Sequence, residues 1–390
     1  MKRFPHTAFS FFFLLPMYIC SFSSALARQK SDTSPLPFVH EAHMNLMLNT
    51  SFTADATPGE AMKLAPRMNY LKWELKGRFD EEFSFHFRQS LTKKAVPGEA
   101  DKAVHSVDYA NITWQPSDRF SLMAGKQLLC LGGYEFWVSG YKVKEFTLFN
   151  DYMNNYATGI TATYRLSPKR SFSLQVVGSK VGSDAETFCY GLPDGVESVN
   201  VPLLATLNYE SFSLNDEWQL RYSLSYGQQA ARRSLAYFTS GHVLRHRKLL
   251  AYWDVNASYE GVDHKGLVSR SFSTKTGETP STAQHAWYFS TVMNADYRFS
   301  EHWNGYLKGI YECGCIARAN GDYQKGGCLH EWQAQACAEY YPKKKLDLKF
   351  YLLAQYRQRF TPAPEGCTPG WRHAARQRLM VGVVYAIPVF

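Results

Sequence analysis

The feature of this sequence that most constrains its fold is a short segment, repeated along the chain, in which apolar and polar side chains alternate. In one clear example, Trp218, Leu220, Tyr222, Leu224 and Tyr226 are each separated from the next by one polar residue. Alternation with a period of two places all the apolar side chains on one face of a β-strand. The segments are about ten residues long, the length that a tilted strand needs to cross a bilayer. The pattern therefore predicts an all-β protein whose strands show one face to lipid and the other to water.

About sixteen segments follow this pattern, an even number as in bacterial outer-membrane barrels. They are 39–48, 68–79, 82–91, 104–115, 119–128, 157–166, 171–180, 201–210, 217–227, 249–260, 265–273, 286–299, 303–313, 330–341, 346–358 and 376–390.

The connections between these segments alternate between short and long. The short ones are 80–81, 116–118, 167–170, 211–216, 261–264, 300–302 and 342–345. The long ones are 49–67, 92–103, 129–156, 181–200, 228–248, 274–285, 314–329 and 359–375. We therefore predict a transmembrane antiparallel β-barrel of about 16 strands, with short periplasmic turns and long extracellular loops.

The composition agrees with a barrel and argues against a helical membrane protein. Aromatic residues make up 15% of the chain, yet the mean hydropathy is negative. After residue 27 the sequence contains no apolar run of the roughly 18 residues that a membrane-spanning helix needs. Many segments begin or end on an aromatic residue, which is typical of strands that meet a membrane interface.

The first 27 residues predict export. Lys2 and Arg3 precede an apolar run at 9–19, and Ala25-Leu26-Ala27 is a small-x-small cleavage site. This order is that of a secretory signal peptide, and the run is too short for the alternative, a membrane anchor. We expect cleavage after Ala27, a short lead at 28–38, and a barrel at 39–390 in the outer membrane of a Gram-negative bacterium.

Residues 68–136 resemble the phosphate-selective porin O/P family, in the form common in Bacteroidetes-type bacteria. They contain a strand–Gly–turn–strand opening (YLKWELKGRFDEEFSFHFRQSL). A hairpin follows that combines Pro116-Ser117-Asp118, Gly125-Lys126 and Gly133-Tyr134-Glu135. The resemblance implies a sixteen-stranded, usually trimeric barrel that passes small anions.

Charged side chains on the polar parity of the strands would line a water-filled lumen and select ions by their field. The candidates for lumen-lining cations are Lys72, Arg88, Lys126, Arg165, Arg221 and Arg298. The chain carries 43 Lys and Arg against 34 Asp and Glu, which favours an anion preference. Alternatively, basic residues near strand ends contact anionic lipid head groups or balance neighbouring carboxylates.

The third and longest loop, 129–156, is predicted to fold into the barrel and narrow it. Its many apolar side chains, such as Phe136, Trp137 and Phe149, would be unfavourable on an exposed loop. Packed against the inner wall, the loop would carry a constriction with these charged residues: Glu135, Lys142, Lys144, Glu145 and Asp151. The alternatives are a loop that lies over the barrel mouth or in a trimer contact.

Two loops suggest further chemistry. Cys315 and Cys328 are candidates for a disulfide across the seventh loop, and the alternative is a metal site that adds Cys313 and His330. The fifth loop, 228–248, is strongly basic and would attract lipopolysaccharide phosphates or anionic solutes, or would simply be solvated. Its basic cluster is Arg232, Arg233, Arg245, His246, Arg247 and Lys248.

These features together predict a porin, a channel for passive diffusion of small hydrophilic solutes with a preference for anions such as phosphate. We expect no enzymatic activity, no cofactor, no metal and no nucleic-acid partner. The expected partners are outer-membrane lipid and lipopolysaccharide, small solutes, and further copies of the chain in a homotrimer. One alternative is an outer-membrane enzyme, but the sequence places no nucleophile or carboxylate at a spacing from a histidine that indicates a catalytic pair. The other is a substrate-specific uptake barrel, for an oligosaccharide or hydrophobic ligand, with tyrosines along the polar parity (Tyr70, Tyr109, Tyr252, Tyr288, Tyr306 and Tyr351).

Overall fold

The computed structural model describes residues 41–92, 106–138, 141–180, 183–188, 190–272, 281–321, 323–326, 328–343, 346–362 and 371–390. The predicted signal peptide and the N-terminal lead lie outside the described residues.

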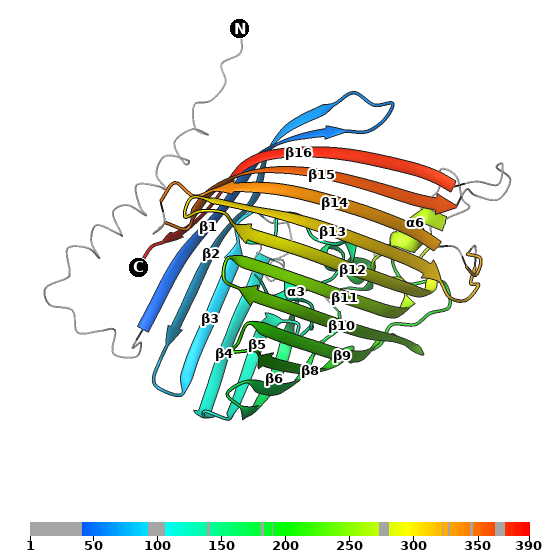
Figure 1. Ribbon diagram of the computed structural model, residues 1–390. Coiled ribbons are helices and arrows are strands. Elements are labelled where there is room, and N and C mark those ends of the chain that lie inside the picture. The colour runs from blue at the N-terminus through cyan, green and yellow to red at the C-terminus, as the bar shows by residue number, and fades with distance from the viewer. Residues whose placement is uncertain are drawn as a thin grey trace, which may run out of the picture.

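Within these ranges, sixteen strands close into one antiparallel barrel, in which each strand pairs with its sequence neighbours and β1 pairs with β16 (Figure 1). The strands are β1 (Glu41–Ala56), β2 (Lys63–Arg78), β3 (Phe83–Ser90), β4 (Val107–Ser117), β5 (Phe120–Leu128), β6 (Tyr156–Ser167), β7 (Arg170–Gly178), β8 (Leu203–Ser213), β9 (Trp218–Ala230), β10 (Arg233–His246), β11 (Leu249–Val262), β12 (Gln284–Arg298), β13 (Trp303–Ile316), β14 (Cys328–Tyr340), β15 (Leu348–Pro362) and β16 (Trp371–Pro388). The predicted fold class is confirmed.

Alternation along each strand decides which side chains face the lumen. On β13, Leu307 is 67% exposed on the outer face, whereas its neighbour Lys308 is 5% exposed and points inward. An outward apolar row matches a lipid environment, and an inward polar row matches water. The period-two pattern that predicted the strands therefore also predicts their orientation.

Strand β10 lies where we predicted the long, basic fifth loop, and that prediction is wrong. Its inward residues Leu235, Tyr237 and Val243 are as apolar as its outward ones, because the third loop covers them inside the barrel. The alternation that marks the other strands is therefore lost. Two-residue connections bound the strand, and Arg232 (φ 57°) and Arg247 (φ 52°) adopt the left-handed backbone of tight hairpins at opposite ends of the barrel.

A helix replaces the strand predicted at 265–273, and the short turn predicted at 261–264 is the start of a longer loop, 263–283. The helix is α6 (Leu267–Phe272). The carboxylate of Asp263 accepts hydrogen bonds from the backbone N–H groups of Gly266 (3.0 Å) and Ser269 (2.9 Å). These bonds satisfy donors that the first helical turn leaves free. The errors at 228–248 and 265–273 compensate, so the predicted strand number is still correct.

The other connections preserve a long side and a short side. Connections after even-numbered strands have two to seven residues, and we call that end of the barrel the turn end. The opposite end, the loop end, carries the connections after odd-numbered strands, although the first of these, at 57–62, is shorter than the predicted 49–67. No helix among the described residues is long and apolar enough to cross a membrane.

The packed interior lies between the barrel wall and two loops that enter from the loop end. The third loop, residues 129–155, carries α3 (Tyr134–Trp137) and α4 (Leu148–Asp151), and α3 is seen inside the barrel in Figure 1. In the largest apolar cluster, Leu148 and Phe149 of α4 join Leu267 and Val268 of α6. The third loop divides the lumen and builds the site described below.

Candidate functional site

The third loop, which we call L3 (129–155), leaves β5 and crosses to the opposite wall. Gly132 makes this crossing possible, because a Cβ atom there would lie 2.3 Å from the carbonyl oxygen of Thr239. Its N–H group donates to Ser223 Oγ (3.1 Å). L3 therefore inserts into the barrel, as predicted, and the alternative of a loop lying over the mouth is wrong.

Two wall carboxylates hold the short helices of L3. Asp254 of β11 accepts the N–H groups of Tyr134 (2.8 Å) and Glu135 (3.0 Å) at the start of α3. Glu312 of β13 accepts those of Leu148 (2.9 Å) and Phe149 (3.0 Å) at the start of α4. Hydrogen bonds from backbone N–H groups to a buried carboxylate are short and strong. The two carboxylates fix the position of L3 against the wall.

Glu339 of β14 is a third anchor. Its Oε1 atom lies 2.9 Å from Lys144 Nζ of L3 and 2.8 Å from Lys349 Nζ of the wall. Its Oε2 atom accepts from Asn304 Nδ2 and Tyr341 Oη, both at 3.0 Å. Lys144, which we predicted in the constriction, is therefore buried and paired. Its ion pair with Glu339 attaches L3 to the wall.

The predicted residues Glu135 and Glu145 also contact the wall. Lys308 Nζ of β13 lies 2.5 Å from Glu135 Oε1 and donates to the backbone oxygen of Glu145 at 2.7 Å. The Glu145 carboxylate pairs with Arg378 of β16 (2.6 Å). Lys142, in contrast, has an exposed side chain.

Between L3 and the part of the wall formed by strands β1 to β4 lies a cavity of about 570 Å³, which we call the passage. Strands β1 to β4 supply one side with Tyr70, Lys72 and Arg88, and L3 supplies the other with Phe146 and Asp151. The side chain of Asp151 is exposed to this cavity. Desolvation by the surrounding protein, followed by the nearby Glu145 carboxylate, raises the pKa of Asp151 to about 6.

Lys72 and Arg88, both predicted to line the lumen, share one carboxylate in the passage. Asp108 lies 2.8 Å from Lys72 Nζ and 3.2 Å from Arg88 Nε. The Arg88 guanidinium also lies 4.5 Å from the ring centre of Tyr109 and donates to Tyr156 Oη (2.5 Å). Glu74 lies 3.9 Å from Arg88 and 3.2 Å from Lys76, so Arg88 is held in place and three cations share two carboxylates.

A cluster of arginines near the loop end was not predicted. Asp55 Oδ atoms lie 2.7 Å from Arg378, 2.8 Å from Arg376 and 3.4 Å from Arg67. The available signal was the parity of β16, since Arg376 and Arg378 alternate with the outward Leu379 and Val381. Beside this cluster, Glu331 pairs with Arg357 (3.3 Å) and Arg359 (2.7 Å).

The remaining predicted cations are distributed along the lumen, with one exception. Arg221 points inward, 3.5 Å from Glu210 and 4.3 Å from the ring centre of Trp137. Arg165 and Arg298 lie inward near the turn end, where their guanidinium groups donate to backbone carbonyls. The exception is Lys126.

Lys126 was predicted to line the lumen, and that prediction is wrong. Its neighbour Gln127 points inward and accepts from Thr161 (2.6 Å). Lys126 is paired in register with Ala110 and Thr158, both exposed residues on the outer face. Alternation along the strand therefore places Lys126 on the outside of the barrel.

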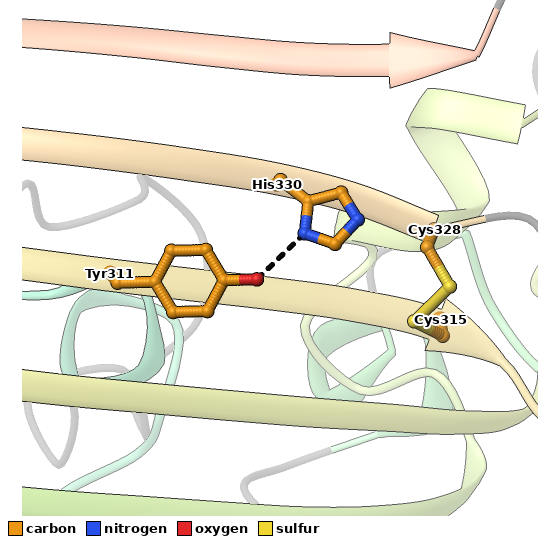
Figure 2. Close-up of a disulfide and its surroundings, with 4 residues drawn as sticks. All are labelled: Tyr311, Cys315, Cys328 and His330. Atoms are coloured by element: carbon orange, nitrogen blue, oxygen red, sulfur yellow. Dashed lines mark hydrogen bonds between the residues drawn. A yellow bond between two sulfur atoms is a disulfide. The ribbon is translucent and has the colours of Figure 1, made fainter.

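The structure contains the disulfide that we considered across the seventh loop. Cys315 at the end of β13 is bonded to Cys328 at the start of β14, with 4.1 Å between their Cα atoms (Figure 2). His330 donates to or accepts from Tyr311 Oη (2.8 Å) on the same pair of strands. Because the disulfide occupies both sulfur atoms, the alternative metal site loses two of its four ligands.

Comparisons with known proteins agree with this architecture. A family model described as phosphate-selective porin O and P matches residues 47–382. The outer membrane channel DcaP of Acinetobacter baumannii is 9% identical, with a TM-score of 0.56 over 89% of this chain and 97% of that chain. Salmonella typhi OmpF is 13% identical, with a TM-score of 0.56 over 88% and 97%. The trimer form of Vibrio cholerae OmpT is 10% identical, with a TM-score of 0.52 over 89% and 99%. A comparison with curated protein sequences gives no significant match.

Proposed function

Since the chain belongs to the phosphate-selective porin O and P family, we propose that it is an outer-membrane porin that passes small hydrophilic solutes by passive diffusion and favours anions such as phosphate. The passage between L3 and strands β1 to β4 is the narrow part of this channel. Transport through it requires no covalent chemistry, because geometry and charge decide which solutes enter.

The observation that carries the anion preference is that cations outnumber carboxylates within the lumen clusters. Three arginines, at 67, 376 and 378, share Asp55 and Glu145. Lys72, Lys76 and Arg88 share Asp108 and Glu74. Glu331 and Glu339 each serve two cations. Each cluster therefore keeps a positive excess although its members are paired. A positive field in a lumen with low-dielectric walls raises the local concentration of anions.

The cellular setting follows from the same proposal. The turn end would face the periplasm, as in outer-membrane barrels generally. We propose that the signal peptide is removed after Ala27 and that three copies assemble in the membrane, as the OmpT trimer form exemplifies for a similar fold. The outward apolar rows would contact lipid and, at the loop end, lipopolysaccharide.

Planar-bilayer recording tests the proposal. In a gradient of KCl, purified protein should give ohmic current steps, and the zero-current potential should move toward the equilibrium potential of chloride. Heat-denatured protein is the control. A preference for potassium would remove the anion selectivity, and the absence of steps would remove the porin function.

Acidification should strengthen the anion preference. With a pKa of about 6, Asp151 is ionised at pH 7.5 and neutral at pH 5, so the passage loses one negative charge as the pH falls. The chloride-to-potassium permeability ratio should therefore rise between pH 7.5 and pH 5. In Asp151→Asn the ratio should already be high at pH 7.5 and should change less. An equal pH response in both proteins would assign the titration to another group.

A further inference from the structure

Behind L3, on the side away from the passage, lies a second cavity of about 280 Å³, which we call the recess. Residues 134 and 141–144 of L3 form one side of it, and the turn-end halves of β11 to β15 form the other. Tyr141, Val143 and Lys144 line both cavities. This short stretch of L3 therefore separates the recess from the passage.

The recess is closed toward the loop end. Asn294, Asp296 and Arg298 of β12 line it, and the next inward residue of that strand, Val292, packs with Ile310, Tyr134 and Tyr252 in an apolar cluster. Strand β13 shows the same change: Lys308 lines the recess, and the next inward residue, Ile310, belongs to the apolar cluster. A solute could enter the recess from the turn end but could not leave through the far side, so the recess holds solutes and does not conduct them.

Cations dominate the charge of the recess. Lys144 and Lys349 share the single carboxylate of Glu339. Lys142 is exposed, and the guanidinium of Arg298 donates to the carbonyl oxygens of Ser300 (3.0 Å) and Glu301 (2.6 Å). Among the described residues, neither Lys142 nor Arg298 forms an ion pair. The Arg298 guanidinium also lies 3.9 Å from the ring centre of Tyr341, so Lys142 and the Nη1 group of Arg298 are what the recess offers to an anionic group of a solute.

The remaining lining is amphipathic and small. Five tyrosines, at 134, 141, 252, 306 and 341, supply ring surface and hydroxyl groups, and Asn294 and Asp296 supply further hydrogen-bonding groups. Asp296 would repel a second anionic group but would accept a hydrogen bond from a solute hydroxyl. The volume is at the lower end of ligand pockets, about 300 Å³, and suits one ring, not an oligomer.

We propose, on the basis of the proposed porin function, that the recess binds a single-ring, hydroxylated solute with one anionic group, such as a sugar phosphate or a sugar acid. The anionic group lies between Lys142 and Arg298, and the ring lies among the tyrosines with its hydroxyls toward Asn294 and Asp296. The channel would then retain such a solute near the periplasm, beyond the passive flow of inorganic phosphate.

Calorimetric titration of the detergent-solubilised protein with probes tests this binding. Glucose 6-phosphate or glucuronate should give a saturable heat of binding, and the two probes distinguish a phosphate from a carboxylate ligand. Glucose and inorganic phosphate at the same concentrations should give much less heat. Equal binding of inorganic phosphate would overturn the role of the ring, and equal binding of glucose would overturn the role of the charge.

Variants place the site. In Lys142→Gln combined with Arg298→Gln, the calorimetric dissociation constant of the effective probe should rise roughly ten-fold. The matched control Lys169→Gln removes a charge at the turn after β6, where Lys169 pairs with Asp216, and should leave it unchanged. An unchanged dissociation constant in the double variant would overturn the assignment to the recess.

Planar-bilayer recording of the same protein separates this inference from the porin function. Heat of binding without any conductance would leave the recess as a binding site while removing the porin function. Conductance without heat of binding would remove the recess as a binding site and leave the porin function. The absence of both signals would overturn both.

Discussion

Single-channel conductance should rise roughly two-fold in a variant that combines Asp254→Ala with Glu312→Ala. L3 then loses four backbone hydrogen bonds to the wall. Each buried donor left without a partner costs about 1–3 kcal/mol, and a change of about 1.4 kcal/mol already alters a population ten-fold. The released loop should vacate part of the lumen, and larger polyethylene glycols should enter the channel in a polymer-exclusion measurement.

A matched control removes a buried wall carboxylate that pairs with the wall itself and not with L3. Glu331 is as buried as Asp254, at 1% exposure each, but its ion-pair partners are Arg357 and Arg359 of the wall. Glu331→Ala should change ion selectivity without raising the size limit for polymers. If the double variant kept the original conductance and size limit, the two carboxylates could not be what holds L3 in the lumen.

Ion selectivity should move in opposite directions when the two sides of the Asp55 cluster are changed. Asp55→Asn leaves Arg67 and Arg376 without a counter-charge, while Arg378 keeps Glu145, and the substitution should increase the chloride preference. Arg376→Gln combined with Arg378→Gln should decrease it. One unit charge about 5 Å from an ion in water contributes about 0.8 kcal/mol, or roughly a four-fold change in local concentration. The zero-current potential in about 0.1 M salt measures both shifts.

Ionic strength provides the control for this pair of variants. Near 1 M salt the Debye length falls to about 3 Å, so both potentials should approach that of the unchanged protein. A shift that persists in high salt, or two shifts of the same sign, would mean that the substitutions act by altering the shape of the channel and not its field.

Much of the architecture could be predicted from the sequence because lipid and water impose a strict period of two on a strand between them. The prediction failed where that condition is absent. Inside β10 the apolar Leu235 and Val243 meet L3 and not water. At 265–273 a capping carboxylate, Asp263, forms a helix from a segment with strand-like composition.

The site was predictable only in part, for a similar reason. Parity identifies which side chains face inward, and in the structure Lys72, Arg88 and Arg221 point into the barrel. Parity does not reveal which charged groups pair, because the partners are far apart along the chain. The pairs are Lys72 with Asp108, Lys144 with Glu339, and Arg376 with Asp55. The sequence therefore does not distinguish Lys144 and Glu312, which hold L3 in place, from charged residues that face solutes.

The anchors of L3 also have a bearing on how the protein is built. Gly132 is 91 residues from Ser223, Tyr134 is 120 from Asp254, Leu148 is 164 from Glu312 and Lys144 is 195 from Glu339. A chain assembled from its N-terminus has no acceptors for L3 until the later strands are in place, and contacts of such long range form slowly. The insertion of L3 is therefore completed only when β14 has joined the sheet, two strands before β16 closes the barrel on β1.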